Sequence, residues 1–119
     1  MKRIQKLDDV RNSNLALCNL NINSTFYYSY LNNLESGNEI MDFCEHIWDK
    51  EVDKIIDHCK EFGISIITIS DTSTQLLDTL ALFESKGCKI GNLTKTKTKF
   101  IDFKTGKNET RNAIKVFIG

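Results

Sequence analysis

The run ISIITIS at residues 64–70 constrains the fold more than any other segment, because almost every position in it is apolar or β-branched. A short run of this kind is typical of a strand that other elements cover, and it predicts a central strand of a sheet. Residues 48–62 repeat apolar side chains at steps of three and four, which predicts an amphipathic helix on that strand, capped by Asp49 and ended by Gly63. The apolar stripe comprises Trp48, Val52, Ile55, Ile56, Cys59 and Phe62.

Three more helices are predicted: one over residues 2–11, one from an N-cap at Ser24 to Gly37, and one after Thr72 or Ser73 to Gly87. The last has an apolar face formed by Leu76, Leu77, Leu80, Ala81 and Phe83. For residues 12–23 the sequence does not decide between a strand and turns. Their apolar residues alternate with asparagine as in a strand, yet asparagine-rich stretches also form turns.

The C-terminal part of the chain predicts a long hairpin. Residues 88–103 read as one strand, or as two joined by a bulge near Gly91, and a turn with Gly106 leads to a last strand at 113–118. The predicted fold is α+β, with N-terminal helices followed by a small three- to four-stranded mixed sheet in β-α-β-β-β order and helices packed on one face. With 119 residues and no linker, a single domain over 1–119 is expected, in which 1–23 is the least determined segment.

The net charge of zero hides an uneven distribution of charge. Residues 1–63 hold 11 acidic and 7 basic side chains, whereas residues 64–119 hold 5 acidic and 9 basic ones. The molecule is therefore expected to be an electrostatic dipole that can steer a charged partner.

The sequence indicates a cytoplasmic protein without a membrane segment. No stretch is long and apolar enough to cross a bilayer, and the opening residues MKRIQKLDDV lack the apolar centre of a signal peptide. Cys18, Cys44, Cys59 and Cys88 are far apart and form no CxxC motif, which favours reduced thiols in the core over disulfides.

Cys44, His46, His58 and Cys59 bring four potential metal ligands into one short window. However, Cys59 lies on the apolar stripe of its helix and His58 lies off it, so their side chains point about 100° apart and do not face one ion easily. We therefore expect two buried thiols and two partly exposed imidazoles, with no metal.

The carboxylates around the same helix form no specific pair, and they fit a solvent-exposed face that stabilises the helix dipole. They are Asp42, Glu45, Asp49, Glu51, Asp53, Asp57 and Glu61. The sequence also has no nucleophile elbow and no glycine-rich phosphate loop. It therefore predicts a protein that is not an enzyme and that needs no cofactor.

Two features are candidates for contact with a partner. Lys95, Lys97 and Lys99 alternate along a strand, so their ammonium groups repeat about every 6.5–7 Å and can follow a phosphate backbone or an acidic protein surface. Lysines on an exposed strand also block edge-to-edge aggregation, which is the competing interpretation. Trp48, with Phe43 and Ile47 close by, is by default a core residue, and the alternative is an anchor at an interface.

Five segments, in order and spacing, resemble a family of small uncharacterised proteins from low-GC Gram-positive bacteria, found on plasmids, conjugative elements and prophages. They are residues 37–43 (GNEIMDF), 47–53 (IWDKEVD), 64–70, 77–88 (LxxLxxFExxGC) and 100–106 (FxDFxTG). Phe100 and Phe103 stand where the family is expected to carry Tyr and Trp, so a hydroxyl and an indole donor are missing. The resemblance implies a mobile-element setting, in which small cofactor-free proteins, anti-CRISPR proteins among them, bind and block a host component.

Together, these observations predict a non-enzymatic protein-binding module of a phage or mobile element, with inhibition of a CRISPR effector nuclease as its candidate activity. The expected partner is a host or CRISPR effector protein, and the expected contacts are Lys95, Lys97, Lys99 and Trp48. The alternative is a nucleic-acid-associated accessory protein that uses the same lysines against phosphates. A small enzyme would need a cleft that joins carboxylates to His46 or His58.

Overall fold

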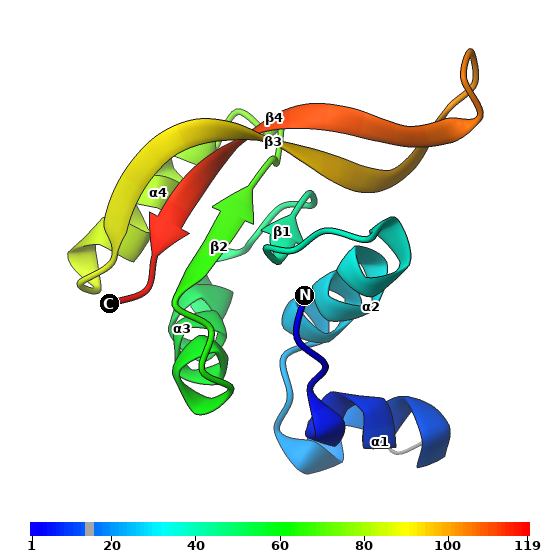
Figure 1. Ribbon diagram of the computed structural model, residues 1–119. Coiled ribbons are helices and arrows are strands. Elements are labelled where there is room, and N and C mark those ends of the chain that lie inside the picture. Colours follow the sequence, from blue (N-terminus) through cyan, green and yellow to red (C-terminus); the bar gives the residue numbers. More distant parts are fainter. Residues whose placement is uncertain (14–15) are drawn as a thin grey trace.

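The computed structural model describes residues 1–13 and 16–119 and has the predicted α+β architecture (Figure 1). The α-helices are α1 (Gln5–Ser13), α2 (Ser24–Ser36), α3 (Val52–Glu61) and α4 (Leu76–Ser85). Two short 3₁₀ helices are η1 (Leu17–Leu20) and η2 (Asp49–Glu51). The strands are β1 (Asp42–Phe43), β2 (Ile66–Ile69), β3 (Lys89–Asp102) and β4 (Lys107–Phe117).

The four strands form one mixed sheet in the order β1-β2-β4-β3. Strand β1 is parallel to β2, and β4 runs antiparallel between β2 and β3. The prediction of a central strand at β2 is confirmed. The fourth strand is β1, which lies before α3 and had not been predicted, because a strand of two residues leaves no periodic signal in the sequence.

One core cluster joins the sheet to the helices. Ile67 lies opposite Val116 in the antiparallel pair β2–β4, and both are completely buried. The same cluster contains buried residues from all four α-helices, among them Leu7, Phe26, Ile55 and Phe83. The predicted packing of amphipathic helices on the 64–70 strand is therefore confirmed. Its driving force is the removal of this apolar surface from water.

Helix ends and faces differ from the predictions at several positions. The N-cap of α2 is Asn23 instead of Ser24, because the Asn23 side chain accepts a hydrogen bond of 2.8 Å from the Phe26 N–H. In α4, Leu77 is 76% exposed and Thr79 is buried. Leu77 precedes Thr79 by two residues, which places it about 200° away around the helix and turns it to solvent. Ala81 is exposed as well.

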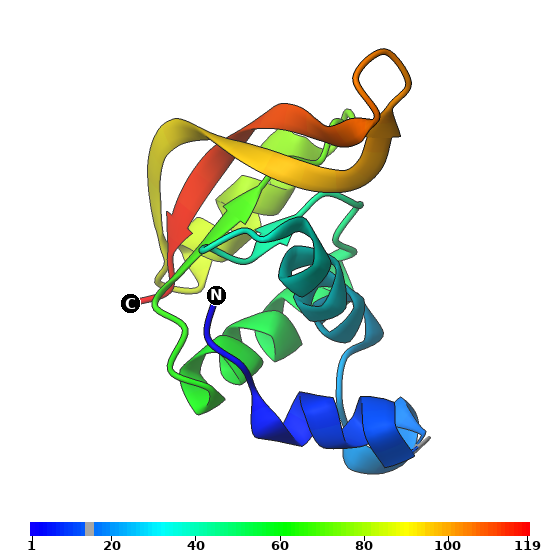
Figure 2. The same cartoon turned by 45° about the vertical axis from the view of Figure 1, so that its right-hand side comes forward.

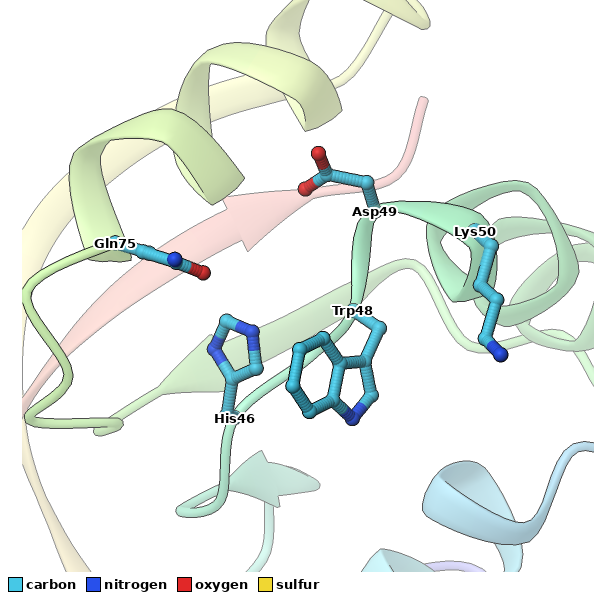
Figure 3. Close-up of a pocket in the computed structure, with 5 residues that line it drawn as sticks. All are labelled: His46, Trp48, Asp49, Lys50 and Gln75. Atoms are coloured by element: carbon cyan, nitrogen blue, oxygen red, sulfur yellow. The ribbon is translucent and has the colours of Figure 1, made fainter.

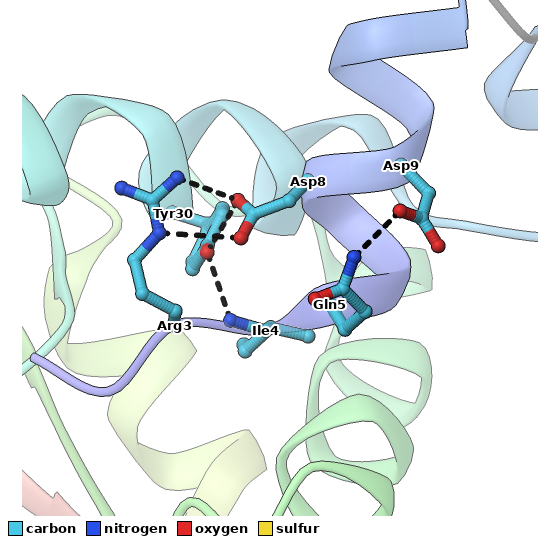
Figure 4. Close-up of polar contacts among 6 residues, drawn as sticks. All are labelled: Arg3, Ile4, Gln5, Asp8, Asp9 and Tyr30. Carbon is cyan, nitrogen blue, oxygen red and sulfur yellow. Dashed lines mark hydrogen bonds and ion pairs between the residues drawn. The ribbon is translucent and has the colours of Figure 1, made fainter.

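Tyr30 links the N-terminal segment to α2 by hydrogen bonds (Figure 4). The Tyr30 hydroxyl donates to an Asp8 carboxylate oxygen at 2.8 Å and accepts from the Ile4 N–H, also at 2.8 Å. Arg3 pairs with the same carboxylate at 3.1 Å. The predicted first helix is confirmed, although it begins at Gln5, and the segment left open contains the 3₁₀ helix η1 instead of a strand. The prediction of a buried thiol at Cys18 lies outside the described side chains.

The β3–β4 hairpin is the most extended part of the molecule, and in both ribbon views it projects beyond β1 and β2 at the end opposite α1 (Figures 1 and 2). The predicted bulge is present as a register shift between Ile90 and Leu93. Gly91 leaves room there for the Phe117 ring, which would have to shift for any larger residue because a Cβ atom at this position would lie 2.6 Å from it. Strand β4 begins at Lys107, earlier than predicted, because its polar first half pairs with the backbone of β3 without an apolar pattern in the sequence.

Candidate interaction surface

The side chains of Lys95, Lys97 and Lys99, called the lysine row here, lie together on the outer side of β3. They are exposed, whereas the alternating Thr96 and Thr98 are buried. Strand β3 is an edge strand of the sheet. The sequence therefore placed the three lysines correctly on one side of a strand, and the period of two in the strand explains this.

The three lysines differ in their partners. The Lys99 ammonium forms an ion pair with Glu45 and lies 5.4 Å from the centre of the Phe100 ring. Among the residues that the structure describes, the ammonium groups of Lys95 and Lys97 make no ion pair with a carboxylate. Within the lysine row, the cations without an ion pair among the described residues are therefore Lys95 and Lys97, whereas the charge of Lys99 is neutralised by Glu45.

The edge of β3 is already blocked at the middle of the lysine row. The Asn38 carboxamide donates to the Lys97 carbonyl at 2.7 Å and accepts from the Lys97 N–H at 3.2 Å. A side-chain amide thus occupies the position that the backbone of an added strand would take. At this position the edge is therefore protected by Asn38, without need of the Lys97 ammonium group.

Beyond the lysine row, the hairpin ends in exposed apolar side chains. Phe103 is 100% exposed, Ile101 is 50% exposed and Phe100 is 39% exposed. We call these three residues the hairpin tip. They were predicted at the end of a strand and in a segment that resembles the family, but their exposure was not predicted. Three large apolar side chains next to a turn, with no following apolar segment to cover them, were the signal that could have marked them as surface residues.

Trp48 is 60% exposed, so its default assignment to the core is wrong, whereas Phe43 and Ile47 are buried as predicted. The cause is local: the chain at Trp48 is extended, and residues 49–51 form a 3₁₀ turn before α3 begins at Val52. The buried stripe therefore starts at Val52. The Trp48 ring stands edge to face with the His46 ring at 4.5 Å between centroids, beside an open cavity (Figure 3).

Glu51, predicted on the exposed face of the helix, is buried. Its carboxylate accepts from Thr25 Oγ1 at 2.6 Å, Asn23 Nδ2 at 2.8 Å and the Trp48 N–H at 3.1 Å. Burial by itself raises the pKa of Glu51, but these hydrogen bonds to the charged form outweigh it, and the pKa lies below its usual value. The N-cap predicted at Asp49 therefore lies at Trp48, where Glu51 accepts from the backbone N–H, and Glu51 ties the start of α3 to the start of α2.

His58 is buried as well, contrary to the partly exposed imidazole that had been predicted. Its Nε2 accepts a hydrogen bond of 3.1 Å from the Asn23 N–H, so the ring is neutral at that nitrogen. Burial lowers the pKa of His58 below its ordinary value. Like Glu51, this histidine joins α3 to the beginning of α2.

We predict a loss of stability in mild acid that depends on His58. Because the folded-state pKa is lowered, the stabilisation is complete above the unfolded-state pKa of about 6.5 and is lost as the pH falls toward the folded-state value. The free energy of unfolding in urea should therefore decrease between pH 7.5 and 5.5 in the wild type and decrease less in His58→Gln, which carries no titrating ring. Equal pH dependence of the two proteins would contradict this role.

The four side chains considered as potential metal ligands are not brought together. His46 contacts Trp48 and Asp71, whereas His58 faces α2, and Cys44 and Cys59 are free thiols. Cys59 is buried as predicted, but Cys44 is only half-buried. In the part of the chain that the structure describes, no group of three or more His, Cys, Asp or Glu side chains could hold a metal ion.

His46 does lie near a serine and an acid, but their arrangement differs from that of a nucleophilic relay. Ser73 Oγ is 3.4 Å from His46 Nδ1, and an Asp71 carboxylate oxygen is 3.5 Å from the same nitrogen. In a Ser-His-Asp triad, the serine and the aspartate form hydrogen bonds with opposite nitrogens of the imidazole. Here Ser73 donates directly to Asp71 at 2.7 Å, so these residues hold the ring in place and do not activate the serine.

Comparison with known proteins gives one match. A family model described as a domain of unknown function (DUF7698) matches residues 25–118, a span that contains the lysine row, the hairpin tip and Trp48. No curated protein and no solved structure matches the chain. Among the described residues, no helix is long and apolar enough to cross a membrane. The expectation of an uncharacterised family is therefore confirmed.

Proposed function

We propose that this chain, which belongs to the family described as a domain of unknown function (DUF7698), is a non-enzymatic module that binds another protein. The observation that carries the proposal is the composition of the projecting hairpin. Lys95 and Lys97, which form no ion pair among the described residues, lie on the same strand as the exposed Ile101, and the fully exposed Phe103 follows directly after that strand.

This combination matches what a protein interface requires. A large apolar side chain that enters a pocket of the partner supplies most of the binding energy, and the surrounding charges determine orientation and rate of association. Phe103, which is 100% exposed, is the candidate anchor. Lys95 and Lys97 are the charges that select an acidic surface beside that pocket.

The biological setting and the target rest on the sequence resemblance. On that basis we propose that the protein comes from a phage or another mobile element and that its target is a CRISPR effector nuclease. The zero net charge argues against a general mimic of DNA, since such a mimic needs a large negative charge. Contact through a basic and apolar hairpin is the mode of inhibition that fits this chain.

The test uses the purified protein and a panel of purified CRISPR effector nucleases. Co-elution in size-exclusion chromatography with one nuclease, together with loss of its DNA cleavage at equimolar protein, is the expected result. A protein that co-elutes with none of the nucleases and leaves their cleavage unchanged contradicts the choice of target.

A second candidate function is binding to single-stranded nucleic acid, and one observation favours it. The Phe100 ring lies 5.4 Å from the Lys99 ammonium and 5.0 Å from the Arg111 guanidinium, so an aromatic ring and cations occur side by side on the hairpin. Single-strand binders combine such groups for stacking and for contact with phosphates.

Under this second candidate, the affinity for a short oligonucleotide should fall as salt rises. Two phosphate contacts, made by Lys95 and Lys97, predict a slope of about −1.4 for the logarithm of the association constant against the logarithm of salt concentration. Fluorescence anisotropy with labelled DNA and RNA measures this slope. No binding to either polymer at low salt removes the candidate.

A further inference from the structure

A second concave site lies away from the hairpin, at the junction between β1 and α3. An open cavity of about 600 Å³ is lined by His46, Trp48, Asp49, Lys50 and Gln75. This volume is within the range of about 300–1,000 Å³ that small-molecule sites occupy. The 60% exposure of Trp48 leaves a large flat aromatic surface uncovered at the wall of the cavity.

The imidazole of His46 is held in a fixed orientation by two neighbouring side chains. Asp71 and Ser73 both address His46 Nδ1, at 3.5 and 3.4 Å, which places the ring proton on that nitrogen when the ring is neutral. Figure 3 shows the other edge of the ring, with Nε2, turned toward the cavity, and the Gln75 carboxamide directed at the same space. The site therefore offers an imidazole acceptor and an amide that both donates and accepts.

These groups match one class of ligand. A nucleobase is flat, so it can stack on an indole, and its edge carries both donors and acceptors that an amide, an imidazole and a carboxylate can pair with. Gln75, His46 and Asp49 supply those three groups around Trp48. Lys50 lines both this cavity and an adjoining one that also contains Lys54. These two cations therefore lie beside the cavity, where the phosphate attached to a bound nucleoside would be placed.

We propose that the cavity at Trp48 binds a nucleobase, stacked on the indole and paired at its edge with Gln75 and His46, with its phosphate near Lys50. The base belongs to a free nucleotide or to one residue of a single strand. None of the residues that line the cavity comes from the β3–β4 hairpin. The inference is therefore independent of the proposed protein-binding surface, and either can fail without the other.

Trp48 is the only tryptophan, so its fluorescence reports directly on the cavity. The full chain is titrated with the four ribonucleoside monophosphates, the matching nucleosides and a short single-stranded oligonucleotide, with excitation beyond the absorption of the bases. Saturable quenching by at least one nucleotide is the expected result. Stronger binding of the monophosphate identifies a free nucleotide as the source of the base, whereas stronger binding of the oligonucleotide identifies a single strand.

Two variants give the decisive comparison. Gln75→Ala keeps the reporter and should weaken nucleotide binding about tenfold. Trp48→Ala, measured by equilibrium dialysis, should weaken it by about ten- to a hundredfold, because stacking is lost. Lys60→Ala, a substitution at an exposed position outside the cavity, should leave it unchanged. No saturable quenching at millimolar nucleotide, quenching by aromatic peptides alone, or equal affinity of Gln75→Ala and wild type would overturn the proposal.

Discussion

Replacing Lys95 and Lys97 together by glutamate is expected to weaken binding of the protein partner by at least about a hundredfold, because two attractive contacts become two repulsive ones. Both side chains are exposed and form no internal ion pair among the described residues, so the free energy of unfolding should change by no more than about 0.5 kcal/mol. Lys99 is left unchanged in this variant, because replacing it would also break its ion pair with Glu45.

The matched control is Lys2→Glu with Lys60→Glu, which changes the net charge by the same amount at exposed positions outside the hairpin. Isothermal titration calorimetry of both double variants against the partner separates a local contact from the general effect of charge. The control should bind within a few-fold of wild type. If both variants lose affinity equally, or if the hairpin variant binds normally, the lysine row is not the contact surface.

Asp42→Ala is expected to lower the free energy of unfolding by about 3 kcal/mol, the largest effect on stability that we predict for one polar side chain. Asp42 is 3% exposed, and its two carboxylate oxygens accept from Thr68 Oγ1 at 2.7 Å and Ser70 Oγ at 2.6 Å. Both hydroxyls are buried on β2 or directly after it. Removal of the carboxylate leaves two buried donors without a partner and also a cavity.

Asp42→Asn is the control for this variant, since the amide keeps the volume and one acceptor. Burial raises the pKa of Asp42, although Ser70 and Thr68 oppose the shift, so the charged form destabilises the folded state at neutral pH. That cost is relieved as the pH falls through the folded-state pKa toward the unfolded-state value of about 3.9. The stability of the wild type relative to Asp42→Asn should therefore increase on acidification. Urea unfolding measures both effects. If Asp42→Ala lowers the free energy of unfolding by less than about 1 kcal/mol, the hydrogen bonds of Asp42 do not stabilise the fold as described.

The parts of the fold that could be predicted are those with a strong local pattern. The β-branched run at residues 64–70 gave the correct element because a strand that is buried on both faces is apolar or β-branched at nearly every position. The stripe from Val52 onward did so because burial of one helix face imposes a period of about 3.6. Trp48 shows the limit of this reasoning. It continues the stripe in the sequence, but a 3₁₀ turn at Asp49–Glu51 changes the phase and leaves the ring in solvent.

The candidate surfaces were predictable to a similar extent. Alternation placed the lysine row on one side of a strand, but the ion pair of Lys99 with Glu45 joins residues 54 positions apart, and no local pattern encodes it. The same holds for Glu51 and His58, which meet Asn23 at separations of 28 and 35 residues. These contacts depend on how α2 packs against α3, and they determine which polar groups are buried and which remain available to a partner.

Hydroxyl-radical footprinting of the protein alone and in its complex tests the central role of the hairpin most directly. Phe103 is 100% exposed on the hairpin, and Tyr28, which is 57% exposed on α2, provides an internal reference. The rate of modification of Phe103 should fall sharply when the partner is bound, whereas that of Tyr28 should not change. An unchanged rate at Phe103 together with protection of Tyr28 would show that the partner binds a different face of the molecule.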